Sequence, residues 1–194
     1  MENKIKVVTF AGSLRLDSYN KKLAKSAFTL ATENGAEAIL IDLADYPLPL
    51  FNEDIENQER PEHLAALREI FLEADALIIA SPEYNGSFSA VLKNTLDWLS
   101  RASKDDGYAP RFNDYAVAIT SASPGGLGGI RGLSHLRELM SNLGSLVIPK
   151  QLAISSAYDA FDEHDNIKNP AKKAQLESVV KNLIHLGQAL KSNN

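Results

Sequence analysis

Ala76-Leu77-Ile78-Ile79-Ala80 is a run of five apolar residues. A strand directs successive side chains to opposite faces of a sheet, so a run without polar positions must be buried on both faces. Burial on both faces is typical of a central strand in a parallel sheet that helices cover above and below. This segment therefore indicates an α/β fold.

Strand-like and helix-like segments alternate on both sides of this run. Further apolar strands are expected at 5–11, 38–43, 115–120 and 146–148. Apolar residues at helical spacing mark helices at 19–34, near 64–74, near 91–99, near 133–143 and at 170–191. A polar segment, 103–113, is expected to leave the sheet.

Five strand–helix units predict one domain over residues 1–194, with a five-stranded parallel sheet and helices on both faces. The flavodoxin-like strand order 2-1-3-4-5 is expected by analogy with such folds. Ligands of such sheets bind outside the carboxyl ends of the strands.

The composition excludes several classes of function. Twenty Lys and Arg against 25 Asp and Glu give a net charge of −5, which provides no general attraction for nucleic acid or an anionic membrane. The absence of cysteine excludes disulfides, thiolate nucleophiles and iron–sulfur clusters. The four histidines are not spaced as a metal site, so no metal is expected. Without a signal sequence or an apolar stretch of about 20 residues, a soluble cytoplasmic protein is expected.

The loop after the first strand carries groups that suit a phosphate. Gly12 permits a tight turn, Ser13, Ser18 and Asn20 offer side-chain donors, and Arg15 adds a permanent positive charge. The amides at the start of the following helix have no intrahelical partners, so converging donors meet a positive helix end. The alternative is that Ser18 only caps the helix and Arg15 is a solvated surface residue. The fingerprints of nucleoside-triphosphate and dinucleotide loops are absent here.

The loop after the third strand, residues 81–87, suits a flat aromatic ligand. Pro82 stiffens the exit from the strand, Tyr84 offers an aromatic surface and a hydroxyl, and Glu83 and Asn85 offer polar side chains. A heteroaromatic ring needs a shaped wall and a few hydrogen bonds. An ordinary turn is the alternative, because proline, asparagine and glycine are common turn residues.

The loop after the fourth strand, residues 120–129, is rich in glycine. It contains Gly125, Gly126, Gly128 and Gly129. Glycine lets a backbone approach a ligand closely and present its amides to it. The alternative is a flexible connection, although such connections are usually shorter.

The three loops contain the motifs Gly12-Ser13-x-Arg15-x-x-Ser18-x-Asn20, Pro82-Glu83-Tyr84-Asn85-Gly86 and Ser123-Pro124-Gly125-Gly126. Together they resemble the NADPH-dependent FMN reductase family, which includes chromate- and quinone-reducing flavoproteins. The resemblance extends from the first strand to about Pro149. Its first two motifs together are specific, and the third is looser.

The resemblance implies a tightly bound FMN and a role for individual residues. The FMN phosphate would be held by Ser13, Arg15, Ser18, Tyr19 and Asn20. The isoalloxazine ring would be lined by Pro82, Glu83, Tyr84 and Asn85, with its other edge closed by Ser121, Gly125 and Gly126. It also implies a homodimer or homotetramer with the flavin near the interface, for which residues 47–51 and the helix after Gly86 are candidates.

The function that the resemblance implies is an FMN-dependent NAD(P)H oxidoreductase. Electrons would pass in a ping-pong cycle from NADPH or NADH to a small acceptor such as a quinone, chromate, an azo compound or a flavin. Because the flavin performs the chemistry, no side chain is nominated as a catalytic acid or base. The alternatives are a non-enzymatic flavodoxin-type electron carrier and a flavin-free phosphate-binding protein. The acceptor, the choice between NADPH and NADH, and the size of the oligomer stay open.

Overall fold

The computed structural model describes residues 4–58, 60–101 and 109–192. Within these ranges a parallel sheet has the strand order β2-β1-β3-β4-β5, with β6 paired to β4. This confirms the predicted order. The strands are β1 (Lys6–Ala11), β2 (Glu37–Ile41), β3 (Ala76–Ala80), β4 (Ala116–Ala122), β5 (Leu146–Val147) and β6 (Leu152–Ile154). The predicted polar excursion at 103–113 falls mostly outside the described residues.

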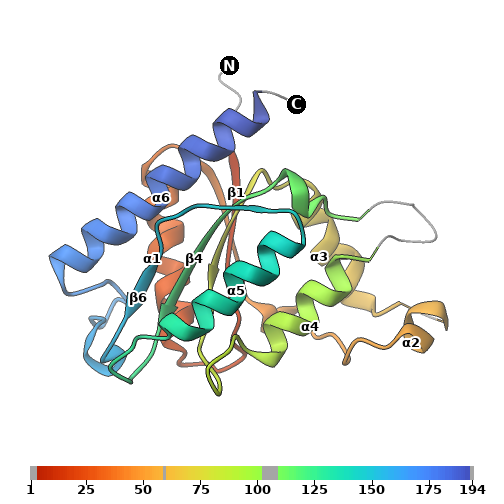
Figure 1. Cartoon of the computed structure of the whole chain (residues 1–194), viewed down its shortest axis with the longest axis horizontal. Coiled ribbons are helices and arrows are strands. Elements are labelled where there is room, and N and C mark those ends of the chain that lie inside the picture. The colour runs from red at the N-terminus through yellow and green to blue at the C-terminus, as the bar shows by residue number, and fades with distance from the viewer. Residues whose placement is uncertain (1–3, 59, 102–108, 193–194) are drawn as a thin grey trace.

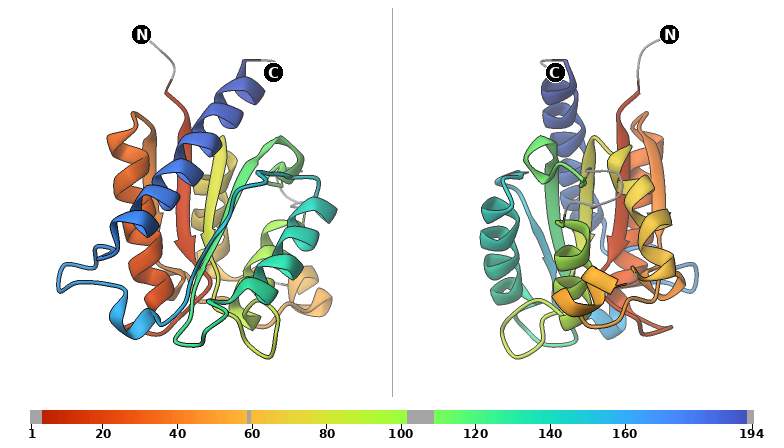
Figure 2. Two further views of the ribbon diagram at one scale, coloured as in Figure 1. Left: turned by 60° about the vertical axis from the view of Figure 1, so that its left-hand side comes forward. Right: turned by 90° about the vertical axis from the view of Figure 1, so that its right-hand side faces the viewer.

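The helices form a layer on each face of the sheet, as expected (Figure 1). They are α1 (Tyr19–Glu33), α2 (Glu53–Gln58), α3 (Glu62–Leu72), α4 (Ala90–Leu99), α5 (Ile130–Asn142) and α6 (Pro170–Lys191). Helices α1 and α6 cover one face, and α3, α4 and α5 cover the other (Figure 2). In the described part of the chain, none of the helices has the length and apolar character that a bilayer crossing requires.

The central strand β3 divides the apolar core into two clusters. All five of its residues are buried, as the apolar run predicted. Ile78 belongs to the cluster beneath α1 and α6, whereas Leu77 and Ile79 belong to the cluster beneath α3, α4 and α5. Alternation along one strand therefore serves both faces of the sheet.

One strand was predicted at 146–148, but two short strands, β5 and β6, lie beside β4 in the structure. Strand β5 pairs with the first residues of β4, and β6 pairs with its last three. Pro149 lies between the two strands. Proline has no backbone N–H to donate to a ladder, which explains an interruption at this point. The predicted count of five strands was therefore one too low.

The strands that precede the first two candidate loops, β1 and β3, end at one level, and β4 continues two residues further, to Ala122. Ala11 of β1 pairs with Ala80 of β3, and Ala80 pairs with Thr120 of β4. The ladder continues by one bond into each of the first two loops, because Gly12 N–H donates to the Ala80 carbonyl and Ser81 N–H donates to the Thr120 carbonyl, both at 2.9 Å. The loops after β1, β3 and β4 therefore leave the sheet side by side.

Candidate cofactor site

The first loop leaves its hydroxyls and its cation available. Ser18 is the N-cap residue of α1, but its side chain makes no capping hydrogen bond. Arg15 is exposed, and its guanidinium has no partner among the described residues. Ser13 is buried beneath the loop and accepts a long 3.4 Å bond from the Arg15 amide. Tyr19 is half-buried against the core at the start of α1. The loop therefore offers a free cation beside an uncapped helix start.

Asn20 joins the first loop to the third. Its side-chain amide donates to the Ala122 carbonyl, and its side-chain oxygen accepts from the Ala122 amide, both at 2.9 Å. The pair is buried. Asn20 therefore fixes the start of α1 against the end of β4, and its assignment as a phosphate ligand stays a prediction.

The second loop ends in a tight turn. Tyr84 and Ser87 exchange two backbone hydrogen bonds, of 2.8 and 3.0 Å, around Asn85 and Gly86. Both central residues have positive φ, 52° and 82°, as a type I′ turn requires. Pro82 is buried at the strand exit, and 51% of Tyr84 is exposed. The turn therefore presents an aromatic side chain at the sheet edge.

Glu83 is committed to a contact within the protein. One carboxylate oxygen accepts from both the Nε and Nη2 atoms of Arg131, at 2.8 and 2.5 Å, and the other accepts from the Gly132 amide at 3.0 Å. Burial alone would raise the pKa of Glu83, but the bonds from the Gly132 amide and the Arg131 guanidinium hold its pKa below the ordinary value. Glu83 therefore fastens the second loop to the start of α5, and its predicted contact with a ring is untested.

The third loop combines a buried anchor with an exposed tip. Ser121 is fully buried, and its hydroxyl has no hydrogen-bond partner in the described residues. Gly129 packs directly on it, since a Cβ added at Gly129 would lie 2.0 Å from the Ser121 Oγ atom. Gly125 and Gly126 are exposed at the tip, where the Gly125 amide donates to Ser123 Oγ at 3.2 Å. The tip therefore presents backbone to a ligand, whereas Ser121 lies beneath it.

Three polar contacts connect the loops to one another or to the helices that follow them. Besides the Asn20 and Glu83 contacts, the Ser89 hydroxyl donates to the Gly12 carbonyl at 2.6 Å. Ser89 also caps α4 by accepting from the Leu92 amide. Sequence reasoning missed Ser89 and Arg131 as parts of the site. The position of Ser89 at a helix start was a usable signal, but nothing local predicted a partner for Arg131.

The donor set suits the expected phosphate and ring of a flavin nucleotide. Arg15, the Ser18 hydroxyl and the amides at the start of α1 belong to one loop, where a phosphate dianion would complete them. Tyr84 and the backbone of Gly125 and Gly126 lie at the same sheet edge, as a ring beside that phosphate requires. The chemistry of these residues therefore fits FMN.

Comparison with known proteins gives a consistent result. A family model described as NADPH-dependent FMN reductase matches residues 5–159. An NAD(P)H-dependent FMN reductase of Pseudomonas aeruginosa is 38% identical over 164 residues, 84% of each chain. An NADPH:quinone oxidoreductase of Arabidopsis thaliana is 37% identical over 185 residues, 92% of this chain and 90% of that protein.

A solved structure shares the fold. A flavoenzyme NAD(P)H:(acceptor) oxidoreductase from Paracoccus denitrificans superposes with a TM-score of 0.79, covering 95% of this chain and 98% of that chain at 24% identity. At this identity the likeness concerns the fold alone.

The Glu83 contacts predict a pH-dependent stability difference. Glu83→Gln should lower the free energy of unfolding by about 1.5–3 kcal/mol at pH 7, because it removes the charge from a carboxylate that accepts three hydrogen bonds. A lowered pKa contributes stability above the unfolded-state value of about 4.3, and this contribution is lost as the pH falls through the folded-state value. The difference in the free energy of unfolding between the variant and the wild type, measured by urea denaturation, should therefore become smaller in acid. Glu163→Gln, at an exposed carboxylate, is the control. A difference that stays constant with pH would contradict this account.

Proposed function

We propose that this chain, which belongs to the NADPH-dependent FMN reductase family, holds FMN across its three adjoining loops and uses one exposed site for both of its substrates. The family match covers most of the chain. The protein is an FMN-dependent NAD(P)H oxidoreductase that passes electrons to a small acceptor. The observation that supports the location of its site is Arg15, which has no side-chain partner among the residues that the structure describes and lies beside the uncapped start of α1.

The residues of the first loop would hold the phosphate of FMN. Arg15 supplies the permanent charge, and Ser13 and Ser18 supply hydroxyls next to the amides at the start of α1. Asn20 contributes by keeping this helix start against β4. When bound, FMN supplies the capacity to accept a hydride from a nicotinamide and to pass the electrons on.

The second and third loops would hold the ring and leave one face open. Tyr84 and the backbone of residues 125–127 are exposed at this edge. Backbone amides aimed at a ring edge stabilise negative charge that develops there. An open face admits a nicotinamide first and an acceptor afterwards, which is the arrangement that a ping-pong cycle needs. No side chain has to transfer a proton in this arrangement.

A quinone is the acceptor that the relatives favour. The Arabidopsis relative is named for NADPH and a quinone, which supports the same substrate class here. Chromate, an azo compound or a free flavin are further small acceptors that an exposed ring can reduce. Relatives named as enzymes also favour this function over a non-enzymatic electron carrier.

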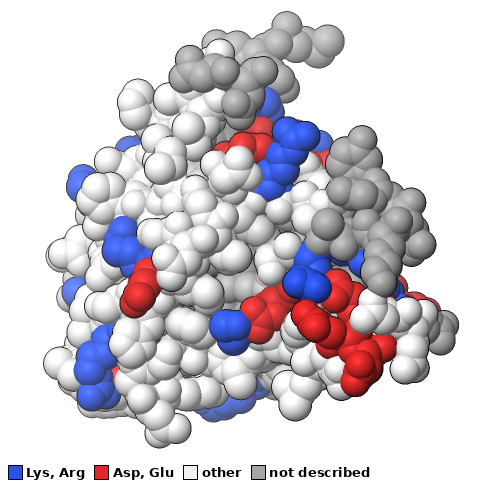
Figure 3. All heavy atoms as spheres, turned by 45° about the vertical axis from the view of Figure 1, so that its right-hand side comes forward, with Lys and Arg blue, Asp and Glu red and all other residues white. Residues whose placement is uncertain are grey.

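The protein is further proposed to be a cytoplasmic homodimer or homotetramer. Residues 47–51 and α4, the two candidates from the sequence, border a hollow of about 240 Å³ with apolar lining from Leu14, Leu43, Pro47, Leu48 and Val91. Two residues further along the chain from the lining residues Leu14 and Leu48, Leu16 is 96% exposed and Leu50 is 78% exposed. Figure 3 shows a face that is white over much of its area, with acidic and basic side chains gathered at its lower right. The absence of cysteine is compatible with the reducing cytoplasm.

The proposed function predicts the spectrum of the purified protein. It should take up FMN and show the visible bands of a flavin. Under anaerobic conditions NADPH should bleach these bands, and a quinone should then restore them. Bands that persist in NADPH would favour the carrier instead. A protein that stays colourless after addition of FMN would contradict flavin binding altogether.

The proposed role of Arg15 leads to a prediction about the affinity for FMN. Arg15→Ala should weaken FMN binding about 10- to 100-fold, since a hydrogen bond to a charged group contributes about 1.5–3 kcal/mol. Fluorescence titration of the apoprotein with FMN measures the dissociation constant, and circular dichroism checks the fold. Arg111→Ala is the matched control, at an exposed arginine 3.9 Å from Asp114. Unchanged FMN affinity in the Arg15 variant would refute the phosphate assignment.

If the exposed residues Leu16 and Leu50 lie in the subunit interface, charged substitutions there should disrupt the oligomer. Leu16→Glu and Leu50→Glu each place a charge where an apolar contact is proposed, so the oligomer should dissociate to a monomer. Size-exclusion chromatography with light scattering measures the mass. Leu40→Glu, at a partly exposed residue of the edge strand β2, should leave the mass unchanged. A wild-type monomer, or oligomers in both variants, would place this proposal in error.

A further inference from the structure

We propose that a cavity beside the third loop binds the adenosine 2′-phosphate portion of NADPH, and that Lys172 makes the protein prefer NADPH to NADH. The cavity has a volume of about 410 Å³ and lies between the end of β6, the 3-10 turn Ala157–Asp159 and the start of α6. This inference rests on the proposed function, in which a nicotinamide nucleotide is the reductant.

Backbone hydrogen bonds join the segment that lines the cavity to the third loop, which would border the flavin. Ser123 N–H donates to the Ile154 carbonyl at 2.9 Å, and the Ser123 carbonyl accepts from the Ala157 amide at 3.1 Å. Ile154 lines the cavity, and Ala157 begins the 3-10 turn that lies beside it. A ligand in the cavity therefore lies next to the candidate cofactor site and outside it. An extended dinucleotide needs this separation between its nicotinamide and its adenosine.

The lining suits a purine nucleoside. Ile154 and Ile167 are buried apolar residues at its wall, and Tyr158, an aromatic residue that is 69% exposed, also lines it. Ser155 and Ser156 add exposed hydroxyls. Pockets for small ligands typically measure about 300–1,000 Å³ and combine apolar walls with a few polar groups. The volume falls within that range, and the lining combines apolar with polar side chains.

The charges of the cavity leave one cation in excess. Lys168 pairs with Asp159, and both line the cavity. Lys172 also lines it, and its ammonium group has no partner in the part of the chain that the structure describes. The amides at the start of α6 are already capped, because the Asn169 side chain accepts from the amides of Ala171 and Lys172. The free charge is therefore the Lys172 ammonium group, which suits a phosphate monoester.

NADH and NADPH differ in the group that this charge would bind. NADPH carries a phosphate on the 2′-oxygen of its adenosine ribose, and NADH carries a hydroxyl there. A lysine that contacts this position stabilises bound NADPH and contributes little to NADH. Lys172 would accordingly act as a residue that determines specificity, apart from the residues proposed to hold FMN.

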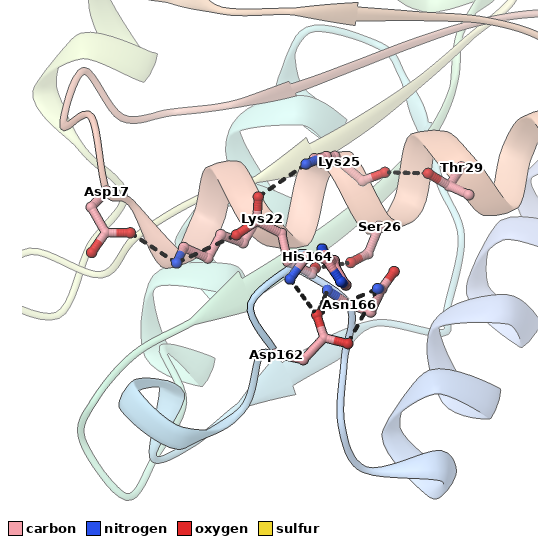
Figure 4. A network of polar contacts seen from close by, with 9 residues as sticks. Asp17, Lys22, Lys25, Ser26, Thr29, Asp162, His164 and Asn166 are labelled. Carbon is pink, nitrogen blue, oxygen red and sulfur yellow. Dashed lines mark hydrogen bonds and ion pairs between the residues drawn. The ribbon is translucent and has the colours of Figure 1, made fainter.

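The segment 161–166, which joins the lining residues Ala160 and Ile167, is held against α1 (Figure 4). Asp165 pairs with Lys22 and Lys25 at 3.4 and 3.0 Å, and its carbonyl accepts from the Ser26 hydroxyl at 3.0 Å. Asp162 closes the same segment by accepting from the amides of His164 and Asn166. A connecting segment that is held in place before binding reduces the entropy lost when a ligand contacts the lining residues on either side of it.

Titration of the flavin-loaded protein with adenosine 2′,5′-bisphosphate tests the inference directly. Calorimetry should show binding of this probe that Lys172→Ala weakens roughly 10-fold, as expected for one charge-assisted bond. The same variant should raise the KM for NADPH roughly 10-fold and change the KM for NADH less than about twofold. Lys173→Ala is the matched control, because Lys173 is the neighbouring exposed residue and lines a different groove with Ser26 and Thr29.

Three results would overturn the inference: unchanged affinity for the probe in Lys172→Ala, an equal loss in Lys173→Ala, or competition by inorganic phosphate as strong as by the bisphosphate. The calorimetric result does not depend on turnover, so it separates this inference from the proposed function. A protein that oxidises NADH with bound FMN, yet shows any of these results, would refute the cavity assignment alone. Failure to bind FMN would refute the proposed function instead.

Discussion

Parallel strands in one register determine where their loops begin. Through Ala11, Ala80 and Thr120, the ladder of β1, β3 and β4 brings three loops to a common edge. This alignment allows short side chains such as Ser89 and Asn20 to bridge from one loop to the next. Together with the contact of Glu83 to α5, these bonds tie each loop to a neighbouring loop or helix, so the loop conformations are largely set by the protein itself. A pre-ordered site loses less entropy when its ligand binds.

The two arginines of the site have different roles. Arg131 is neutralised by Glu83, and together they connect the second loop to α5. Arg15 has no such partner in the described residues and remains the cation that faces outward from the first loop. A similar division separates Lys168, paired with Asp159, from Lys172. In both places a neutralised pair shapes the backbone, and a single unpaired cation is left for an anion.

Sequence patterns predicted the parts of the fold that depend on local order. The apolar run at 76–80 and the long helix at 170–191 have the expected bounds, because burial and periodicity are properties of the segment itself. Helix α2 was missed because none of its residues is buried, so it carries no apolar stripe. The interruption at Pro149 was missed because an apolar run preceded it.

The motifs located the three loops correctly but did not reveal which atoms within them are already engaged. The roles of Glu83 and Asn20 depend on partners far along the chain, Arg131 and Ala122, which only the folded structure brings together. Ser121 is likewise covered by Gly129. Residue type alone therefore does not separate a ligand contact from a support of the loop.

The divided strand at the β5–β6 position has a consequence for the behaviour of the protein at high concentration. An exposed sheet edge offers unpaired amides and carbonyls to any other chain that approaches it, which is how edge-to-edge aggregation begins. Here the two pieces are two and three residues long and a proline lies between them. Neither piece offers a long ladder to a foreign strand. The interruption at Pro149 thus protects this side of the sheet against the addition of a foreign strand during expression and storage.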